Sequence, residues 1–181
     1  MARLRYISSA ELAESERHLL DRPINLFRAL AHNPEVLAQM SAVGSWIRYW
    51  CTLDPRLREL AILQVGYSAG SEYEFSHHVR IGMDFGVAEA DVEALIAESK
   101  GQDSGLDERA RCVLAAAREL TVGVHLRDET WSSLSRHFDP PHLVGLLFVI
   151  THYIQVTRLL GALQIDVENE YQPYLEKFLS P

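Results

Sequence analysis

Cysteine, glycine, proline and long apolar runs are all scarce in this sequence. Its 181 residues include two cysteines, Cys51 and Cys112, without Cys-x-x-Cys spacing, so a disulfide framework is excluded and reduced, packing cysteines in a cytoplasmic protein are predicted. The longest apolar run, Leu143 to Ile150, is interrupted by Gly145 and is far shorter than the ~20 residues of a spanning helix. The N-terminal residues include no apolar stretch of signal-peptide length. We therefore expect no membrane association.

Basic residues are outnumbered by acidic ones. Lys and Arg total 17 against 25 for Asp and Glu, a net charge of -8 with neutral histidines. The arginines are scattered and form no basic patch, which argues against nucleic-acid binding. A small-molecule partner is the remaining expectation, and the chain is long enough to bury a core without a metal or disulfide staple.

Apolar residues recur at spacings near 3.6, and alternating runs are rare. Pro and Gly fall between the periodic segments, where they start and end helices. The pattern predicts a compact all-α bundle of about nine helices in one domain, 1–181. This domain comprises an N-terminal helical extension (1–50), core motif helices (53–100) and a second helical half (106–165). The expected helices cover 8–20, 24–32, 34–50, 55–70, 71–85, 88–100, 108–121, 129–138 and 142–163.

The helix expected over 71–85 has two different polar stripes. Glu74 and His78 share one stripe with Ile81 and Phe85, which require a core, so both polar side chains should face apolar surroundings. A separate stripe holds Tyr73, His77, Arg80 and Asp84, and we expect this stripe to be solvated.

The preceding helix, 55–70, is apolar on nearly every side and carries Glu59 near its start. Gly66 and Gly70 leave room for a close helix contact or for a cavity, and a short turn after Gly70 should fold the two helices together. Glu59, Glu74 and His78 then form an acid-base set, in which burial and the second carboxylate raise a carboxyl pKa. The alternative is a buried Glu–His pair with a purely structural role.

The segment LDPRLRELAILQVGYSAGSEYEFSHHVRIGMDFGVAEADVEAL resembles the carboxymuconolactone decarboxylase / alkylhydroperoxidase-D-like family. The resemblance continues through LDERARCVLAAARELT, DETWSSL and THYIQVTRLLGAL, and spans about Pro23 to Val167. It implies an all-α fold that assembles into homotrimers or homohexamers.

The peroxidase branch of that family has a glutamate, a Cys-x-x-Cys pair and a histidine. Here Glu59 and His78 match, while Ser71 and Glu74 stand at the two cysteine positions. A thiol peroxidase is therefore not expected, since neither replacement can reduce a peroxide. The decarboxylase branch also lacks the cysteines and has a glutamate four residues before the histidine. The resemblance then implies cofactor-free loss of CO₂, or a related lyase or isomerase step, on a small carboxylated or carbonyl substrate.

In this reading His78 gives or takes the proton, Glu59 orients it, and Glu74 is the second carboxylate. Substrate-binding residues are expected at the positions Ser71, Tyr73, His152 and Tyr153, although Ser71 also fits a helix cap. Glu74-x-x-His77 is half of a di-iron signature, and without a second copy we expect no metal. An oxidoreductase of the same family and a non-catalytic oligomer with a buried Glu/His network remain open alternatives.

Overall fold

The computed structural model describes residues 1–179, so Ser180 and Pro181 of the expected domain lie outside the described residues. The described residues form α-helices and short 3₁₀-helices without a strand, which confirms the all-α class. The α-helices are α1 (Asn25–Leu30), α2 (Pro34–Tyr49), α3 (Pro55–Ser68), α4 (Glu72–Asp84), α5 (Glu89–Ser99), α6 (Glu108–Val122), α7 (Asp128–His137), α8 (Pro140–Leu163) and α9 (Gln172–Phe178).

The starts of the helices follow the expected signals. Asn33, Asp54 and Asp139 each accept a hydrogen bond from a backbone N–H of the following first turn. Each of these caps is followed by a proline at the first helical position. Gly86 ends the α4 segment with a φ of 91°, a left-handed conformation that glycine adopts readily.

Both ends of the chain differ from the sequence expectation. Residues 8–20 form two 3₁₀-helices, η1 (Ser9–Glu11) and η2 (Glu14–Leu20), in place of one α-helix. The chain is extended at Leu12 and Ala13, and only Leu12 and Leu20 of this stretch are buried, which is too little apolar surface to support a continuous α-helix. Beyond residue 165, η3 (Asn169–Tyr171) and α9 form a segment that was not predicted.

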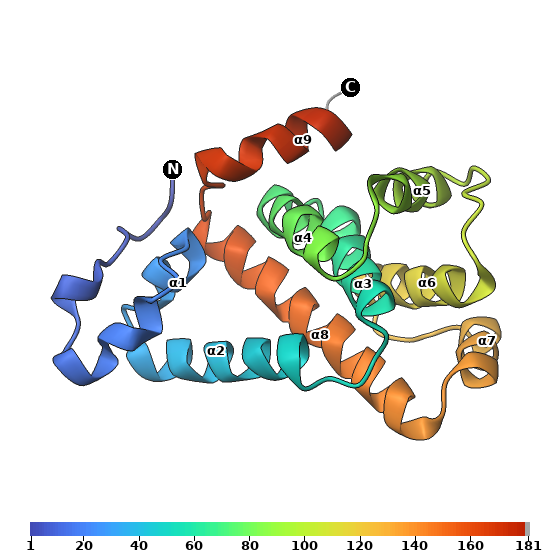
Figure 1. Ribbon diagram of the computed structural model, residues 1–181, viewed down its shortest axis with the longest axis horizontal. Helices are drawn as coiled ribbons and strands as arrows, with labels where there is room; N and C mark the ends of the chain where they lie inside the picture. Colours follow the sequence, from blue (N-terminus) through green and yellow to red (C-terminus); the bar gives the residue numbers. More distant parts are fainter. Residues whose placement is uncertain (180–181) are drawn as a thin grey trace.

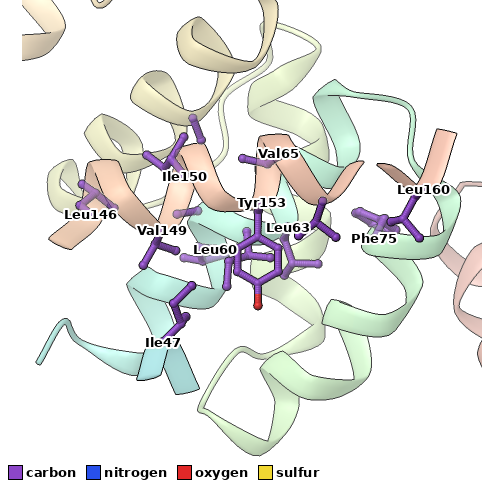
Figure 2. Close-up of a cluster of buried hydrophobic side chains, with 14 of the residues drawn as sticks. Ile47, Leu60, Leu63, Val65, Phe75, Leu146, Val149, Ile150, Tyr153 and Leu160 are labelled. Carbon is purple, nitrogen blue, oxygen red and sulfur yellow. The ribbon is translucent and has the colours of Figure 1, made fainter. Parts of the chain in front are cut away.

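Helix α3 lies at the centre of the core and packs most extensively against α4, α6 and α8. Ten of its residues are buried, from Leu57 to Gly66, as expected for a helix that is apolar on nearly every side. Figure 1 shows α8 running diagonally through the molecule, with α2 along one side and α9 beyond α4. In Figure 2 Leu60, Leu63 and Val65 of α3 meet Val149, Ile150 and Tyr153 of α8.

Helix α8 is long and apolar enough to cross a membrane by length and composition alone. Half of its most apolar stretch is buried within the protein, as in the core helix of a globular domain. Its contacts with α3, α6 and α7 account for this apolar character.

Gly66 sets the distance between α3 and α4. A Cβ atom at this position would lie 3.0 Å from the backbone nitrogen of Phe75 and 3.2 Å from its Cα. Of the two possibilities left by the sequence, a close helix contact is therefore the one found at Gly66.

Gly66→Ala should lower the free energy of unfolding by about 1–3 kcal/mol, because the backbone of α4 must move to admit the methyl group. Urea denaturation measures this loss. Gly161→Ala is the control, since nothing lies within 4 Å of a Cβ built at Gly161 on α8. A loss no larger than that of the control would contradict the close contact.

Candidate active site

Four ionisable side chains from α3 and α4 form a buried line. Arg58 donates to Oε1 of Glu59 from Nε (3.1 Å) and Nη2 (2.9 Å). The other carboxylate oxygen of Glu59, Oε2, lies 2.8 Å from Nδ1 of His78. On the far side of the ring, Nε2 of His78 lies 3.1 Å from Oε1 of Glu74. The structure therefore brings Glu59, Glu74 and His78 together, with Arg58 as a fourth member.

A helix cap and an aromatic contact hold this line in place. Gly82, one turn after His78, is buried, and a Cβ there would lie 3.2 Å from Cγ2 of Val87 and at an ordinary contact distance, 3.6 Å, from Cβ of Glu59. Ser71 caps α4 and accepts a hydrogen bond from the backbone N–H of Glu74 at 3.4 Å. The guanidinium of Arg58 lies over the ring of Phe85 (4.5 Å), a cation–π contact, and its Nη1 donates to the backbone carbonyl of Arg48 at 3.3 Å.

The ion pairs change the protonation of His78 and Glu59. Burial lowers the pKa of His78, but the hydrogen bonds and charges of Glu59 and Glu74 outweigh it and raise this pKa to about 9. Burial raises the pKa of Glu59, yet His78 and Arg58 together hold it below its ordinary value. The expectation of a raised carboxyl pKa is thus wrong for Glu59. At neutral pH His78 is an imidazolium whose two N–H groups face two carboxylates.

This linkage predicts how stability depends on pH. The pKa of His78 rises from its ordinary value of 6.5 to about 9 on folding, so the folded state binds the proton more tightly than the unfolded state. The contribution of His78 to the free energy of unfolding should be complete below pH 6.5, decrease by up to about 1.4 kcal/mol per pH unit toward pH 9, and then level off. Urea denaturation across this range measures the slope. His78→Asn should lack this component, and an unchanged slope in that variant would assign the effect to other groups.

A cavity of about 270 Å³ opens beside this line. It lies between α1, α2, α4, α8 and the segment that links η2 to α1. The lining includes Glu74, His78, Tyr73, His152 and Tyr153, so three of the four expected substrate-binding residues are present. Ser71 is not part of the lining and serves as a cap. Glu59 does not reach the cavity either and lies behind His78.

The aromatic wall of the cavity is built by α8. The ring of Tyr153 meets that of His78 edge-on at a centroid distance of 4.9 Å, and His152 meets Tyr153 in the same way at 5.4 Å. Burial lowers the pKa of His152, so this imidazole is neutral where His78 is charged. The two cavity histidines therefore differ in charge.

In the second stripe of α4, Tyr73 and His77 are buried, contrary to expectation, whereas Arg80 and Asp84 are exposed as expected. Nε2 of His77 lies 2.8 Å from Oε2 of Glu168, and the Tyr73 hydroxyl donates to Oε1 of Glu168 at 3.1 Å. The His77 ring is stacked between Tyr73 (4.1 Å) and Tyr171 (3.6 Å). The C-terminal segment that supplies Glu168 and Tyr171 thus covers a face that a local helical wheel leaves open.

The Glu74-x-x-His77 pattern does not converge on one point. Glu74 faces His78, while His77 faces Glu168 on another side of α4. Within residues 1–179 no group of three His, Cys, Asp or Glu side chains has an arrangement suited to a metal ion.

Both cysteines are unpaired and lie away from the cavity lining. Cys51 is half-buried and Cys112 is buried. Burial raises the pKa of the Cys112 thiol to about 11, which suppresses the reactive thiolate. Neither cysteine is placed to attack a ligand in the cavity.

The sequence reading missed Arg58 and Glu168. Arg58 is 2% exposed, on a helix that is otherwise apolar on nearly every side. A cation next to Glu59 in such an apolar helix is the sequence feature that could have indicated this buried pair. Glu168 had no local signal, because its partners Tyr73 and His77 lie more than 90 residues earlier.

The protein is an all-α bundle with an acid-base line between two consecutive helices. Neither of its cysteines lines the cavity. The carboxymuconolactone decarboxylase family model matches residues 34–119, which include α2 to α4 and the whole line. This match agrees with the resemblance to the carboxymuconolactone decarboxylase / alkylhydroperoxidase-D-like family over the part of the chain that holds the line.

Solved structures share the fold at low sequence identity. The debrominase Bmp8, in complex with 2,3,4-tribromopyrrole, has a TM-score of 0.77 at 17% identity, with 98% of this chain and 100% of that chain covered. An alkylhydroperoxidase core protein from Ralstonia eutropha JMP134, an uncharacterized peroxidase-related protein, has a TM-score of 0.76 at 18% identity, covering 94% of each chain. A protein of unknown function from Agrobacterium tumefaciens has a TM-score of 0.68 at 16% identity, covering 77% of this chain and 94% of that one. No curated protein matches the chain.

Proposed function

We propose that this protein is a cofactor-independent enzyme that moves a proton to or from a small carboxylated or carbonyl substrate. The observation that supports this most directly is the Glu59–His78–Glu74 line, which ends at a cavity. Such a line holds a proton on His78 Nε2 next to the space where a substrate lies. Arg58 and Glu59 keep the imidazole charged and fix its orientation.

The reaction class that fits this arrangement is decarboxylation or a related lyase or isomerase step. In a decarboxylation the C–C bond to the carboxylate breaks, and its electron pair enters a conjugated carbonyl to give an enolate as CO₂ leaves. Proton transfer from His78 Nε2, shared with Glu74, to the enolate carbon completes the exchange of CO₂ for hydrogen. The imidazole then regains its proton from solvent.

Two further observations support this class of reaction over a thiol peroxidase. Neither cysteine lines the cavity, and serine and glutamate occupy the positions of the family's thiol pair. The fold relative Bmp8 was solved with a tribrominated pyrrole, so a protein of this fold holds a small ring compound. A small ring carboxylate is of comparable size.

With both cysteines free, we also propose that the enzyme acts in the cytoplasm.

The test is a survey of substrates. Purified protein is incubated with β-keto acids and carboxylated unsaturated lactones, and CO₂ release and deuterium uptake from D₂O are followed. Turnover of at least one compound that is strongly reduced in His78→Asn, and reduced at alkaline pH in Glu59→Gln, supports the proposal. A non-catalytic role is indicated if no compound turns over and Glu59→Gln lowers only the melting temperature.

We also propose that the chain forms a homo-oligomer through an aromatic face on α2 and α8, comprising Trp46, Tyr49, Trp50, Val144 and Phe148. Their exposed fractions range from 40% for Trp46 to 75% for Trp50, and Trp46 and Phe148 meet edge-on at 5.5 Å. A contiguous apolar patch of this kind is typical of a protein interface. A second copy of the chain is the partner we propose.

Trp50→Glu and Phe148→Glu should shift the protein from oligomer to monomer, because each places a charge within an apolar contact. Size-exclusion chromatography with light scattering measures the mass in solution. Val36→Glu, a change at an exposed apolar residue near the other end of α2, should leave the mass unchanged. A wild-type monomer would contradict this proposal.

A further inference from the structure

Helix α2 contributes one polar face to the cavity, opposite the acid-base line. Ser41, Gly44, Ser45 and Arg48 follow one another at i, i+3, i+4 and i+7, and all four line the cavity. A Cβ built on Gly44 meets nothing within 4 Å, so this glycine leaves open space at the cavity wall. Ser41 Oγ is buried and has no hydrogen-bond partner among the described residues.

The charges around the cavity do not cancel. Arg58, Glu59, His78 and Glu74 alternate in sign and pair with one another, so the line contributes no net charge when His78 carries its proton. The cavity lining adds two arginines, Arg22 and Arg48, and its only carboxylate is Glu74.

These two arginines differ from most others near the core. Arg56, Arg58 and Arg118, for example, pair with carboxylates. Arg22 and Arg48 form no salt bridge within residues 1–179, although both are partly buried. Arg48 shares the cavity lining with Tyr153 and His78. In a protein of net charge -8, a guanidinium that lines a cavity and forms no salt bridge fits an anionic ligand.

The rest of the lining indicates the body of that ligand. Ile24, Leu26, Phe27, Met40, Ile81 and Val156 surround the cavity with apolar surface. A volume of about 270 Å³ lies at the small end of ligand cavities and fits a compound of one ring. A planar carboxylate matches the fork of a guanidinium, which can donate two parallel hydrogen bonds.

We infer that α2 is the recognition wall of this site, where Arg48 binds the carboxylate of a small, flat, largely apolar acid. Gly44 provides the space for its ring, and the hydroxyls of Ser41 and Ser45 are available to further polar atoms of the ligand. The inference rests on the proposed function in placing the opposite end of the ligand at His78. Arg48 is thus a specificity-determining residue and takes no part in the proton transfer.

A binding experiment without turnover tests this inference. Isothermal titration calorimetry measures the dissociation constants of benzoate and of its neutral isostere benzamide for wild-type protein. We expect benzoate to bind at least about tenfold more tightly, the size of effect that a charge-assisted hydrogen bond gives. Arg48→Gln should remove that preference. Arg158→Gln, which removes an exposed arginine of α8 outside the cavity lining, should retain it.

A second variant tests the location. Gly44→Leu adds a side chain where the structure has open space, so the protein should fold while both probes bind at least tenfold more weakly. Equal affinity of wild-type protein for the two probes, or an Arg48→Gln variant that still prefers benzoate, would overturn the inference. Because no step of the assay requires catalysis, benzoate recognition by Arg48 in a protein without turnover would refute the proposed function and leave this inference standing.

Discussion

Replacing His78 by Asn should lower kcat by about 10²–10⁴-fold, because asparagine cannot supply the proton that His78 shares with Glu74. Steady-state kinetics on a substrate identified by the survey measures this change. Since His78 acts on the reaction rather than on ligand recognition, KM should change much less than kcat. His18→Asn, a change at an exposed histidine of η2, provides the matched control.

Glu59→Gln separates catalysis from simple structural support. The pKa of His78 is raised mainly by Glu59, so the loss of that carboxylate charge should move the alkaline limb of the kcat profile from near pH 9 to lower pH. A purely structural network predicts a lower melting temperature in both variants and no such displacement. Unchanged kcat in His78→Asn would refute the assigned role.

Arg58→Met should lower the free energy of unfolding by about 3–5 kcal/mol, the usual cost of leaving one partner of a buried ion pair unpaired. The Arg58 and Glu59 side chains are 2% and 3% exposed, so solvent can do little to replace the lost guanidinium. Equilibrium urea denaturation measures the loss.

The neighbouring Arg56 gives a matched control in the same turn of α3. Arg56 also pairs with a carboxylate, Asp91, but its side chain is 30% exposed, so Arg56→Met should cost only about 1 kcal/mol. Equal losses for the two variants would contradict the buried character of the Arg58–Glu59 pair. The double variant Arg58→Met/Glu59→Gln should recover part of the loss, since it removes the unpaired charge.

The sequence was sufficient for the all-α class and for the meeting of Glu59, Glu74 and His78. The caps at Asn33, Asp54 and Asp139 and the i, i+4 spacing of Glu74 and His78 are local signals, and local signals determine where helices start and which side chains share a stripe.

The sequence was not sufficient where distant segments decide the surroundings of a side chain. Tyr73 and His77 are buried because residues 168–171 cover them, and no spacing within α4 records that cover. The pKa of Glu59 is lowered rather than raised because His78 and, less strongly, Arg58 stabilise its charge, and a helical wheel does not specify the rotamer that brings Arg58 to Glu59. The i, i+3, i+4, i+7 spacing of Ser41, Gly44, Ser45 and Arg48 places these residues on one face of α2. That this face lies opposite His78 follows only from the packing.

The groups that would carry the reaction and those that would select the ligand lie on different helices. The acid-base line belongs to α3 and α4, whose close approach at Gly66 tolerates little change, whereas the opposite wall belongs to α2, where Gly44 and Ser45 border open space. Substitutions along α2 would therefore redirect the protein to other compounds at little risk to its chemistry, which makes this helix the natural starting point for a library of altered selectivity.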